Sequence, residues 1–328
     1  MLRVGTRGSR LALKQTDEFI QQIKILDNDI QCEIVQIKTT GDLIVDKSLV
    51  DIGGKALFLK EIEESLLDNQ IDVAIHSLKD VPAILPPSLI IPAVLARNTP
   101  LDVLIAQYSL ENLPYGAIIG TCAVRRKAFL LNLLGDKVNV VDMRGNIDTR
   151  LNKLKSGVVD GIILAKAGLD RLKLYSSQMY TIPANVILPA IGQGVIAIEC
   201  RATDHKIIEI LSKINHLKTF ICVTAERGFM IEICGNCKTP IAALASLEGD
   251  LLRLDVAFAA PNGAKIFKYS TQDLITNDAI VTAYNLGVKA AQVIKNDIRN
   301  SEYFGVLREL FEYGAGDGNR THMASLEG

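Results

Sequence analysis

The 328-residue chain has no marked excess of charge of either sign, because 36 Lys and Arg nearly balance 37 Asp and Glu. A formal net charge of −1 argues against a chain whose whole surface binds nucleic acid or an anionic membrane. Any cationic function must therefore be local. Long apolar runs are also lacking, since prolines interrupt the longest ones, such as LPPSLIIPAVLA, which are too short to cross a bilayer.

An export signal is not evident either. The first residues, MLRVGTRGSRLALKQ, contain no apolar segment followed by a cleavage pattern, so no signal peptide is predicted. The six cysteines are scattered along the chain and do not form a compact disulfide framework. In a chain of this size without an export signal, we expect reduced thiols and a cytoplasmic location.

What the chain does have is a composition typical of a globular protein, with 48% apolar and 22% charged residues. Its length predicts two or three domains. Short apolar runs alternate with helical periodicity over the first 200 residues or so, which indicates mainly parallel sheets covered by helices. Two stretches that contain proline or glycine, 82–100 and 187–200, are predicted to be a domain boundary and a hinge.

After about residue 220 the pattern changes. A helix over 220–233 is followed by three predicted antiparallel strands at 241–248, 251–259 and 264–270, and by a helix over 278–295. This order indicates a separate α+β domain. The tail over 314–328 has no periodicity and is predicted to be disordered.

Lys and Arg recur where helices are expected to begin after strands. The positive end of the helix dipole disfavours cations there, so their repeated presence indicates an anion site at the carboxyl ends of the strands. The positions are Arg7 and Arg10, Lys55 and Lys60, Lys79 beside Asp80, Arg125 and Arg126, and Arg144 and Arg150. The simpler alternative is that each is a solvated surface charge.

The phosphate-binding loop and the dinucleotide fingerprint are both absent from the sequence. Many separate guanidinium groups instead suit a ligand that carries several carboxylates, because each planar fork can bind one carboxylate through two hydrogen bonds. We therefore interpret these cations as a receptor for a polycarboxylate.

Two thiols in the segment EICGNCKTPIA, Cys234 and Cys237, have C-x-x-C spacing. A redox pair usually opens a helix after a strand, whereas this pair follows a helix and precedes Pro240. A zinc site would need two further ligands at short spacing, and none of the four histidines is near in sequence. On the residues alone, a redox pair, a metal site, a single nucleophile and structural thiols all remain open.

A series of segments spanning Met1 to Phe311 closely resembles the porphobilinogen deaminase (hydroxymethylbilane synthase) family. In order they are GTRGSRLAL, GGKALFLKEIE, AIHSLKDVP, GTCAVRRKAFL, MRGNIDTRLNKL, GIILAKAGLDRL, LPAIGQGVIAIECR and TAERGFM with CGNCKTPI. The resemblance implies two α/β lobes like those of a type II periplasmic binding protein, with the active cleft between them, and a small C-terminal α+β domain. Its implied domains are 1–95 with 195–216, 96–194 and 217–313.

The resemblance also implies a transferase that condenses four porphobilinogen molecules head to tail on a covalently bound dipyrromethane primer. Ammonia is released at each step, and linear hydroxymethylbilane is then freed for tetrapyrrole (haem) biosynthesis. A cytoplasmic monomer is implied, with no metal, nucleic acid or membrane partner.

Site residues carry over from the resemblance motif by motif. Cys237 matches the cysteine that holds dipyrromethane through a thioether, and Asp80 matches the catalytic carboxylate. The other cofactor contacts implied are Ser77, Lys79, Arg125, Arg126 and Arg144, and the substrate contacts are Arg7, Lys55, Arg144 and Arg150. Physically, a buried Asp80 near pyrrole N–H groups would stabilise a cationic pyrrole and move protons.

Some positions depart from the family pattern. Asn236 stands where Gly is expected, and Cys122 and Ala123 replace hydroxyl residues that could bind cofactor carboxylates. Asn tolerates positive φ better than most residues, so the turn can survive. Cys234 is expected to be incidental, although oxidation could join it to Cys237 in an inactivating disulfide.

Two other functions fit part of the sequence. A non-catalytic two-lobed module that binds carboxylates would account for the cations but not for the cysteine loop in an added domain. A thiol oxidoreductase would account for the cysteine pair but not for the cations. A covalent dipyrromethane on the purified protein would exclude both.

Overall fold

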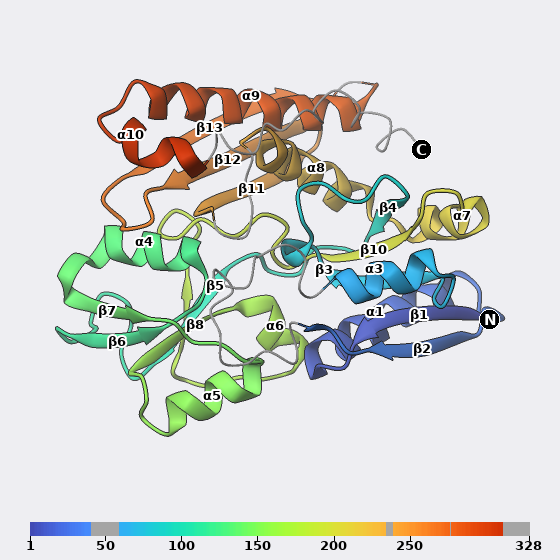
Figure 1. Ribbon diagram of the computed structural model, residues 1–328, viewed down its shortest axis with the longest axis horizontal. Helices are drawn as coiled ribbons and strands as arrows, with labels where there is room; N and C mark the ends of the chain where they lie inside the picture. The colour runs from blue at the N-terminus through green and yellow to red at the C-terminus, as the bar shows by residue number, and fades with distance from the viewer. Residues whose placement is uncertain (41–58, 234–238, 276, 311–328) are drawn as a thin grey trace. The chain divides into compact units, whose positions relative to one another are not determined.

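The computed structural model describes residues 1–40, 59–233, 239–275 and 277–310 (Figure 1). The predicted disordered tail, 314–328, lies outside these residues. Two compact units divide the described chain, with unit 1 formed from 1–98 and 194–221 and unit 2 from 99–193 and from residue 222 onward. None of the helices in the described ranges is long and apolar enough to cross a membrane.

Unit 1 is built on a five-stranded sheet with the strand order β2-β1-β3-β10-β4. Strand β1 runs parallel to β2 and β3, while β10 runs antiparallel to β3 and β4. The strands are β1 (Leu2–Arg7), β2 (Cys32–Ile37), β3 (Val73–Ser77), β4 (Leu89–Val94) and β10 (Ile196–Arg201).

Helices cover both faces of the unit 1 sheet. Helices α1 (Arg10–Leu26) and α7 (His205–Ile214) pack on one face through Phe19, Ile23 and Leu211. Helix α3 (Lys60–Leu67) packs on the other face through Ile62 and Leu66. Helix α1 begins after Ser9, whose Oγ accepts a hydrogen bond from the Ala12 N–H at 3.3 Å and satisfies a free helix-end donor. Strand β3 leads into the 3-10 helix η1 (Leu78–Asp80).

Unit 2 contains a second five-stranded sheet with the order β7-β6-β8-β5-β9. Strand β6 is parallel to β7 and β8, and β5 is antiparallel to β8 and β9. The strands are β5 (Asp102–Ala106), β6 (Ala117–Gly120), β7 (Val138–Val141), β8 (Gly161–Ala165) and β9 (Met179–Ile182). Its helices are α4 (Val124–Leu134), η2 (Gly135–Lys137), α5 (Ile147–Lys155) and α6 (Lys166–Arg171).

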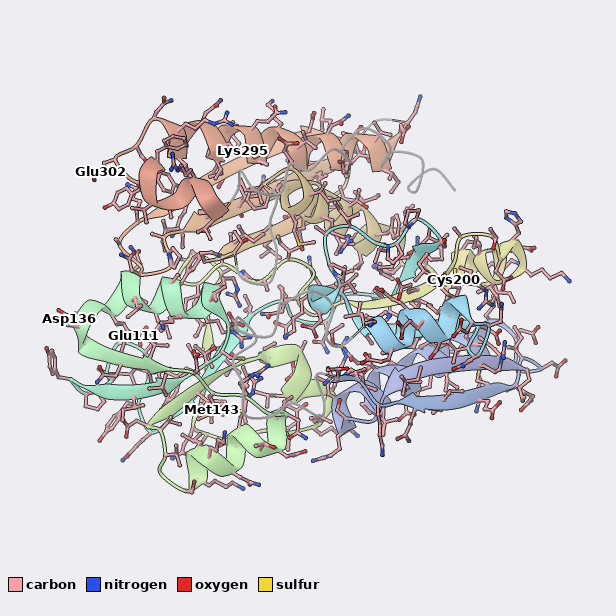
Figure 2. The ribbon with its side chains drawn as sticks, viewed as in Figure 1. Glu111, Asp136, Met143, Cys200, Lys295 and Glu302 are labelled. Atoms are coloured by element: carbon pink, nitrogen blue, oxygen red, sulfur yellow. The ribbon has the colours of Figure 1, made fainter. Side chains whose placement is uncertain are left out.

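A three-stranded antiparallel sheet, β11-β12-β13, also belongs to unit 2. Its small side chains Ala242, Ala257 and Ala259 join the core formed by Phe129 and Leu130 of α4. The remaining elements are β11 (Ile241–Glu248), β12 (Leu251–Ala259), β13 (Ile266–Leu274), α8 (Leu217–Glu232), α9 (Ala279–Arg299), α10 (Phe304–Leu307) and η3 (Arg308–Leu310). Lys295 of α9, labelled in Figure 2, forms an ion pair with Glu232 of α8 at 3.1 Å.

The fold class predicted from sequence is confirmed, with two α/β sheets and a small C-terminal α+β part. The prediction of mainly parallel sheets is wrong, because each five-stranded sheet has as many antiparallel as parallel strand pairs. The stretch predicted as a boundary, 82–100, contains β4, and the one predicted as a hinge, 187–200, contains most of β10. Both are strands of the unit 1 sheet. Strand β4 was not predicted because it contains Pro92. It is an edge strand, and edge strands tolerate proline.

Candidate active site

The turn after β3 presents the predicted catalytic carboxylate. Leu78 anchors this turn, since its side chain is buried and its N–H donates to the Val195 carbonyl at 3.0 Å. The next two side chains, Lys79 and Asp80, are exposed. Within the described residues, the Asp80 carboxylate has no hydrogen bond or ion pair. The expectation of a buried Asp80 is therefore wrong for the described chain, because the turn projects its charges outward.

The Ser77 side chain, at the end of β3, is held by helix α1. The Gln15 amide of α1 lies 2.8 Å from Ser77 Oγ through Nε2 and 3.1 Å through Oε1. Gln15 is only 5% exposed, so its amide is fixed by packing. Gln15 was not predicted to have a role, because a single Gln on a helix carries no signal until the strand that it faces is known.

Arg7 ends β1, the parallel neighbour of β3, so it lies at the same edge of the unit 1 sheet as Ser77. Its side chain is half-buried. Unit 1 thus gathers Arg7, Ser77, Lys79 and Asp80 at the carboxyl ends of β1 and β3, as the sequence predicted. Lys55 lies outside the described residues.

In unit 2, the predicted pair Arg125 and Arg126 opens α4 and is buried, with each residue 5% exposed. Both guanidinium groups bind Asp102, which is fully buried at the start of β5. Arg125 Nη2 lies 2.8 Å from Asp102 Oδ2, and Arg126 donates to Oδ1 through Nη2 at 2.8 Å and Nε at 3.1 Å. Arg125 Nη1 also donates to the Leu188 carbonyl at 2.7 Å, and Arg126 Nη1 donates to the Ile163 carbonyl at 3.0 Å.

Gln193 completes this cluster, which we call the Asp102 cluster (Asp102, Arg125, Arg126 and Gln193). Its Nε2 donates to Asp102 Oδ1 at 2.9 Å and to the Pro100 carbonyl at 2.6 Å. Burial opposes ionisation of Asp102, yet the two adjacent guanidinium groups hold its pKa well below its usual range. One carboxylate faces two guanidinium groups, so the cluster keeps a net positive charge. The cofactor-binding role of the arginine pair remains a prediction.

Arg150 of α5 connects the loops that follow β6 and β7. Its Nε donates to the Gly145 carbonyl at 2.8 Å, and its Nη2 lies 3.7 Å from Cys122 Sγ. Gly145 has φ +108°, and a Cβ there would lie 2.9 Å from Thr149 Cβ, so only glycine fits this turn. Arg144, just before it, is half-buried. Unit 2 therefore brings Arg144 and Arg150 to the edge at which β6 and β7 end.

Buried Met143 packs at the edge where β6 and β7 end. Met143, labelled in Figure 2, packs against Gly120 at the end of β6, where an added Cβ would come within 2.7 Å of the Met143 methyl carbon. Because Met143 immediately precedes Arg144, this contact fixes where the cationic loop leaves the sheet. The nearby residue Ala123 occupies the N-cap of α4 and offers no side-chain hydrogen bond. The helix start that carries the arginine pair therefore lacks the usual cap.

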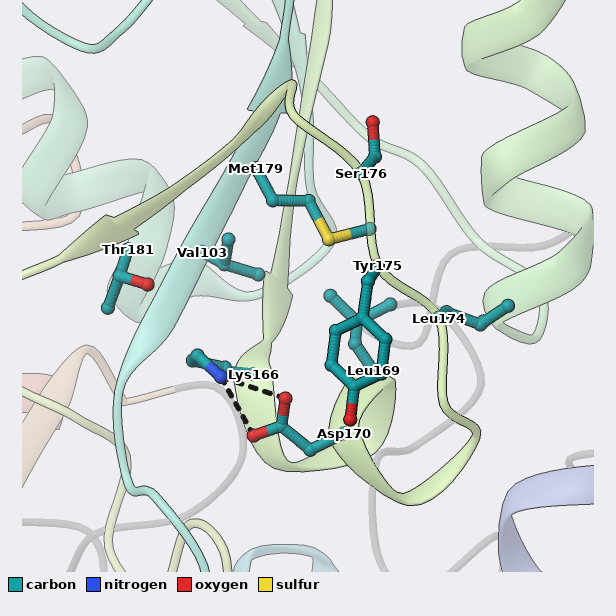
Figure 3. Close-up of a pocket in the computed structure, with 9 residues that line it drawn as sticks. All are labelled: Val103, Lys166, Leu169, Asp170, Leu174, Tyr175, Ser176, Met179 and Thr181. Carbon is teal, nitrogen blue, oxygen red and sulfur yellow. Dashed lines mark hydrogen bonds and ion pairs between the residues drawn. The ribbon is translucent and has the colours of Figure 1, made fainter.

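Beside α6 lies a cavity of about 200 Å³ in unit 2 (Figure 3). Lys166 Nζ reaches both oxygens of Asp170, at 2.8 and 2.9 Å, so its charge is already compensated. Leu169 and Met179 give the cavity an apolar wall. None of the described site residues predicted from sequence lines it, and we assign it no part in the candidate site.

Cys234, Asn236 and Cys237 lie outside the described residues. The chain on either side of them is fixed by Glu226 of α8, which is fully buried. Its carboxylate accepts from the Gly192 N–H at 2.8 Å and the Ala245 N–H at 2.9 Å. Glu226 thus joins α8, β11 and the segment before β10. Among the described residues, no group of His, Cys, Asp or Glu could hold a metal ion.

Chemically, each unit offers cations at the carboxyl ends of its parallel strands. Unit 1 adds Asp80, a carboxylate without a partner among the described residues, and unit 2 adds a buried cluster with a net positive charge. Such edges suit a ligand with several carboxylates and a reaction that develops positive charge near Asp80.

Comparison with known families gives two matches. A family model described as "Porphobilinogen deaminase, dipyromethane cofactor binding domain" matches residues 2–209, and one described as "Porphobilinogen deaminase, C-terminal domain" matches residues 220–296.

Curated relatives are similar along nearly their whole length. The porphobilinogen deaminase of Rickettsia prowazekii is 48% identical over 297 residues, which cover 89% of this chain and 97% of the relative. That of Syntrophomonas wolfei is 48% identical over 271 residues, covering 82% and 88%. Among solved structures, a TRAP periplasmic solute binding protein from Desulfovibrio salexigens is similar at a TM-score of 0.38 and 12% identity, over 66% of this chain and 73% of that one.

Proposed function

The chain belongs to the porphobilinogen deaminase family of transferases, and we propose that it joins four porphobilinogen molecules head to tail into linear hydroxymethylbilane. Each condensation releases one ammonia, and the product enters tetrapyrrole (haem) biosynthesis. The observation that carries this proposal is the match of residues 2–209 to a domain that binds a dipyrromethane cofactor.

The residues at the two sheet edges suit such a cofactor, which carries several carboxylates. Lys79 and Arg144 offer cationic donors, Ser77 a hydroxyl group, and Arg125 and Arg126 a buried positive field. We assign the covalent attachment to Cys237, through a thioether. When bound, the group supplies the nucleophilic pyrrole carbon from which the chain is extended.

Asp80 is the proposed catalytic residue. Loss of ammonia from the substrate's aminomethyl group and formation of the new carbon–carbon bond place positive charge on pyrrole. A carboxylate beside the pyrrole N–H groups stabilises that charge and can take up and return a proton. Asp80 has no competing partner among the described residues and sits on an anchored turn, so a ligand can engage it fully.

Substrate carboxylates are assigned to Arg7, Lys55, Arg144 and Arg150. Arg150 is already oriented by the Gly145 carbonyl and the Cys122 sulfur. This orientation reduces the conformational entropy that would be lost when the guanidinium group binds a carboxylate. Hydrogen bonds to a charged group of this kind contribute about 1.5–3 kcal/mol each.

The proposed organisation has three domains, 1–95 with 195–216, 96–194 and 217–313. The three observed sheets support this division. We further propose a cytoplasmic monomer that needs no metal and binds neither nucleic acid nor membrane. The near-neutral net charge of −1 supports the last point.

The test is to incubate the purified chain with porphobilinogen and to measure ammonia release and hydroxymethylbilane. Asp80→Ala is expected to keep the cofactor and to lose most turnover, since general acid–base catalysis typically contributes about 10²–10⁴-fold. Asp68→Ala, which removes another exposed carboxylate of unit 1, is the matched control. Near-normal turnover by Asp80→Ala would remove Asp80 from the mechanism, and a wild-type chain without product would refute the function.

A further inference from the structure

A buried hydrogen bond between a histidine and a glutamate lies directly before the proposed catalytic turn. His76 Nε2 is 2.9 Å from Glu199 Oε2, and their side chains are 5% and 0% exposed. They come from adjacent antiparallel strands, β3 and β10, in which His76 pairs with Ala197 and Glu199 with Ala74. The pair therefore ties the last residues of β3 to a strand more than a hundred residues away in sequence.

Glu63 of α3, the helix that packs on this face of the sheet, lies close enough to both residues to interact with them electrostatically. Glu63 Oε1 and Glu199 Oε1 are both buried, and neither has a hydrogen-bond partner among the described residues. An ionised, buried carboxylate without a partner is costly, so one of the two should retain a proton. Burial and the neighbouring Glu199 raise the pKa of Glu63 to about 7, with His76 opposing the increase. We call these residues the His76 cluster (His76, Glu199 and Glu63).

Further charged groups lie on this face of the sheet, and two of them have partners of their own. Arg201 of β10 donates to the Leu66 and Ile71 carbonyls at 2.7 Å each and pairs with Asp72 and Asp204. Glu61 accepts from Thr40 at the start of α3. Arg7, at the end of β1, falls on the same face by strand alternation. The charges that act on Glu63 are those of Glu199 and His76.

The cluster is connected to the catalytic turn by the strand itself. His76 is followed immediately by Ser77, which Gln15 holds from the α1 face, and then by the turn that carries Lys79 and Asp80. The end of β3 is thus fixed from both faces of the sheet, by a neutral amide on one side and by ionisable groups on the other. In this pair of contacts, the groups that ionise lie on the α3 face.

On the basis of the function proposed above, we propose that His76 and Glu199 are positioning residues for the Ser77–Asp80 segment, and that protonation of Glu63 is required for that positioning. With Glu63 protonated, α3 places a neutral side chain near the His76–Glu199 hydrogen bond. With Glu63 ionised, two carboxylates confront each other beside β3, and their repulsion weakens the contact of α3 with β3 and β10.

The expected pH range follows from the ionisation of Glu63. At a pKa of about 7, the protonated fraction falls from about three quarters at pH 6.5 to about 3% at pH 8.5. If only the protonated form positions Asp80 correctly, kcat falls by at most about 25-fold over this range relative to a variant that cannot ionise.

Glu63→Gln is that variant, since its amide has the shape of the protonated acid. We expect wild type and Glu63→Gln to have similar kcat at pH 6.5 and to diverge by at least about threefold at pH 8.5, with the wild type slower. Glu64→Gln, on the exposed side of α3, is the matched control and should follow the wild type. Glu199→Gln should move the decline to lower pH, because it removes the charge that raises the pKa of Glu63.

His76 is tested by two substitutions. The amide of His76→Gln reaches the position of Nε2 and should retain most of kcat, whereas His76→Asn is too short and should lose about tenfold or more, the equivalent of one lost charged hydrogen bond. Both variants should keep the cofactor, measured by intact mass, and an unchanged KM. Equal kcat for the two variants would overturn the positioning role of His76.

Thermal unfolding across pH gives a readout independent of turnover. Because the pKa of Glu63 is raised in the folded state, the contribution of Glu63 to stability is largest below its unfolded pKa. This contribution is lost as pH rises through 7. Wild type should therefore fall below Glu63→Gln in melting temperature above pH 7. If the dependence of kcat on pH is the same for wild type and Glu63→Gln, this inference is overturned and the proposed function is not affected. A wild type that makes no hydroxymethylbilane at any pH overturns the proposed function and this inference with it.

Discussion

Asp102→Asn tests how the structure maintains two buried guanidinium groups in unit 2. The substitution keeps the size of the side chain and removes the charge that faces Arg125 and Arg126 at 2.8 Å each. Asp102 is fully buried and the two arginines are 5% exposed, so water cannot replace the lost anion. Removing one partner of a buried ion pair costs about 3–5 kcal/mol, and we expect the free energy of unfolding of unit 2 to fall by this amount at pH 7.

The pH dependence of this loss has a definite sign. Because the arginine pair lowers the pKa of Asp102, its stabilisation is present above the unfolded pKa of aspartate and is lost as pH falls through the lower folded pKa. The difference between wild type and Asp102→Asn should therefore be constant near neutrality and shrink below about pH 4. Urea unfolding, followed at several pH values, measures it.

Asp170→Asn is the matched control for this experiment. It breaks the Lys166–Asp170 pair, whose side chains are 34% and 20% exposed, and should cost at most about 1 kcal/mol. A loss for Asp102→Asn as small as that of the control would refute the reasoning. It would mean that Arg125 and Arg126 do not depend on Asp102 for charge compensation.

Three further substitutions test local contacts in unit 2, each by urea unfolding. Ala123→Ser supplies the missing N-cap of α4 and should stabilise by about 0.5–1 kcal/mol, whereas no gain would mean that the helix end is already satisfied. Glu226→Gln leaves one of two buried backbone N–H groups unpaired and should cost about 1–3 kcal/mol, while an unchanged midpoint would argue against this bridge. Gly145→Ala should cost about 1–3 kcal/mol, since φ is +108° there, and tolerance would show that the turn can rearrange.

Local patterning predicted much of the fold. The strands predicted over 241–248 and 251–259 have the bounds of β11 and β12. Alternation and helical periodicity are local signals, and these elements depend on them. Strands β4 and β10 were not predicted, because Pro92 and the glycines before β10 look like loop residues until the neighbouring strands are known.

The cations at the sheet edges were predicted because strand ends and helix starts can be read locally. The counterion of the arginine pair was not, since Asp102 precedes Arg125 by 23 residues. Nor was the partner of His76, since Glu199 follows it by 123 residues. Only the assembled sheet brings these groups into contact. For the same reason, the sequence predicted the arginine pair as ligand-facing cations without indicating that both bind a buried carboxylate.

The attachment of dipyrromethane to Cys237 is the central claim, and intact mass of the purified full chain tests it most directly. Wild type, Asp80→Ala and Cys234→Ser should all exceed their sequence mass by two linked pyrrole units, and Cys237→Ser should not. An unmodified wild type, or an adduct that persists in Cys237→Ser, would contradict the account.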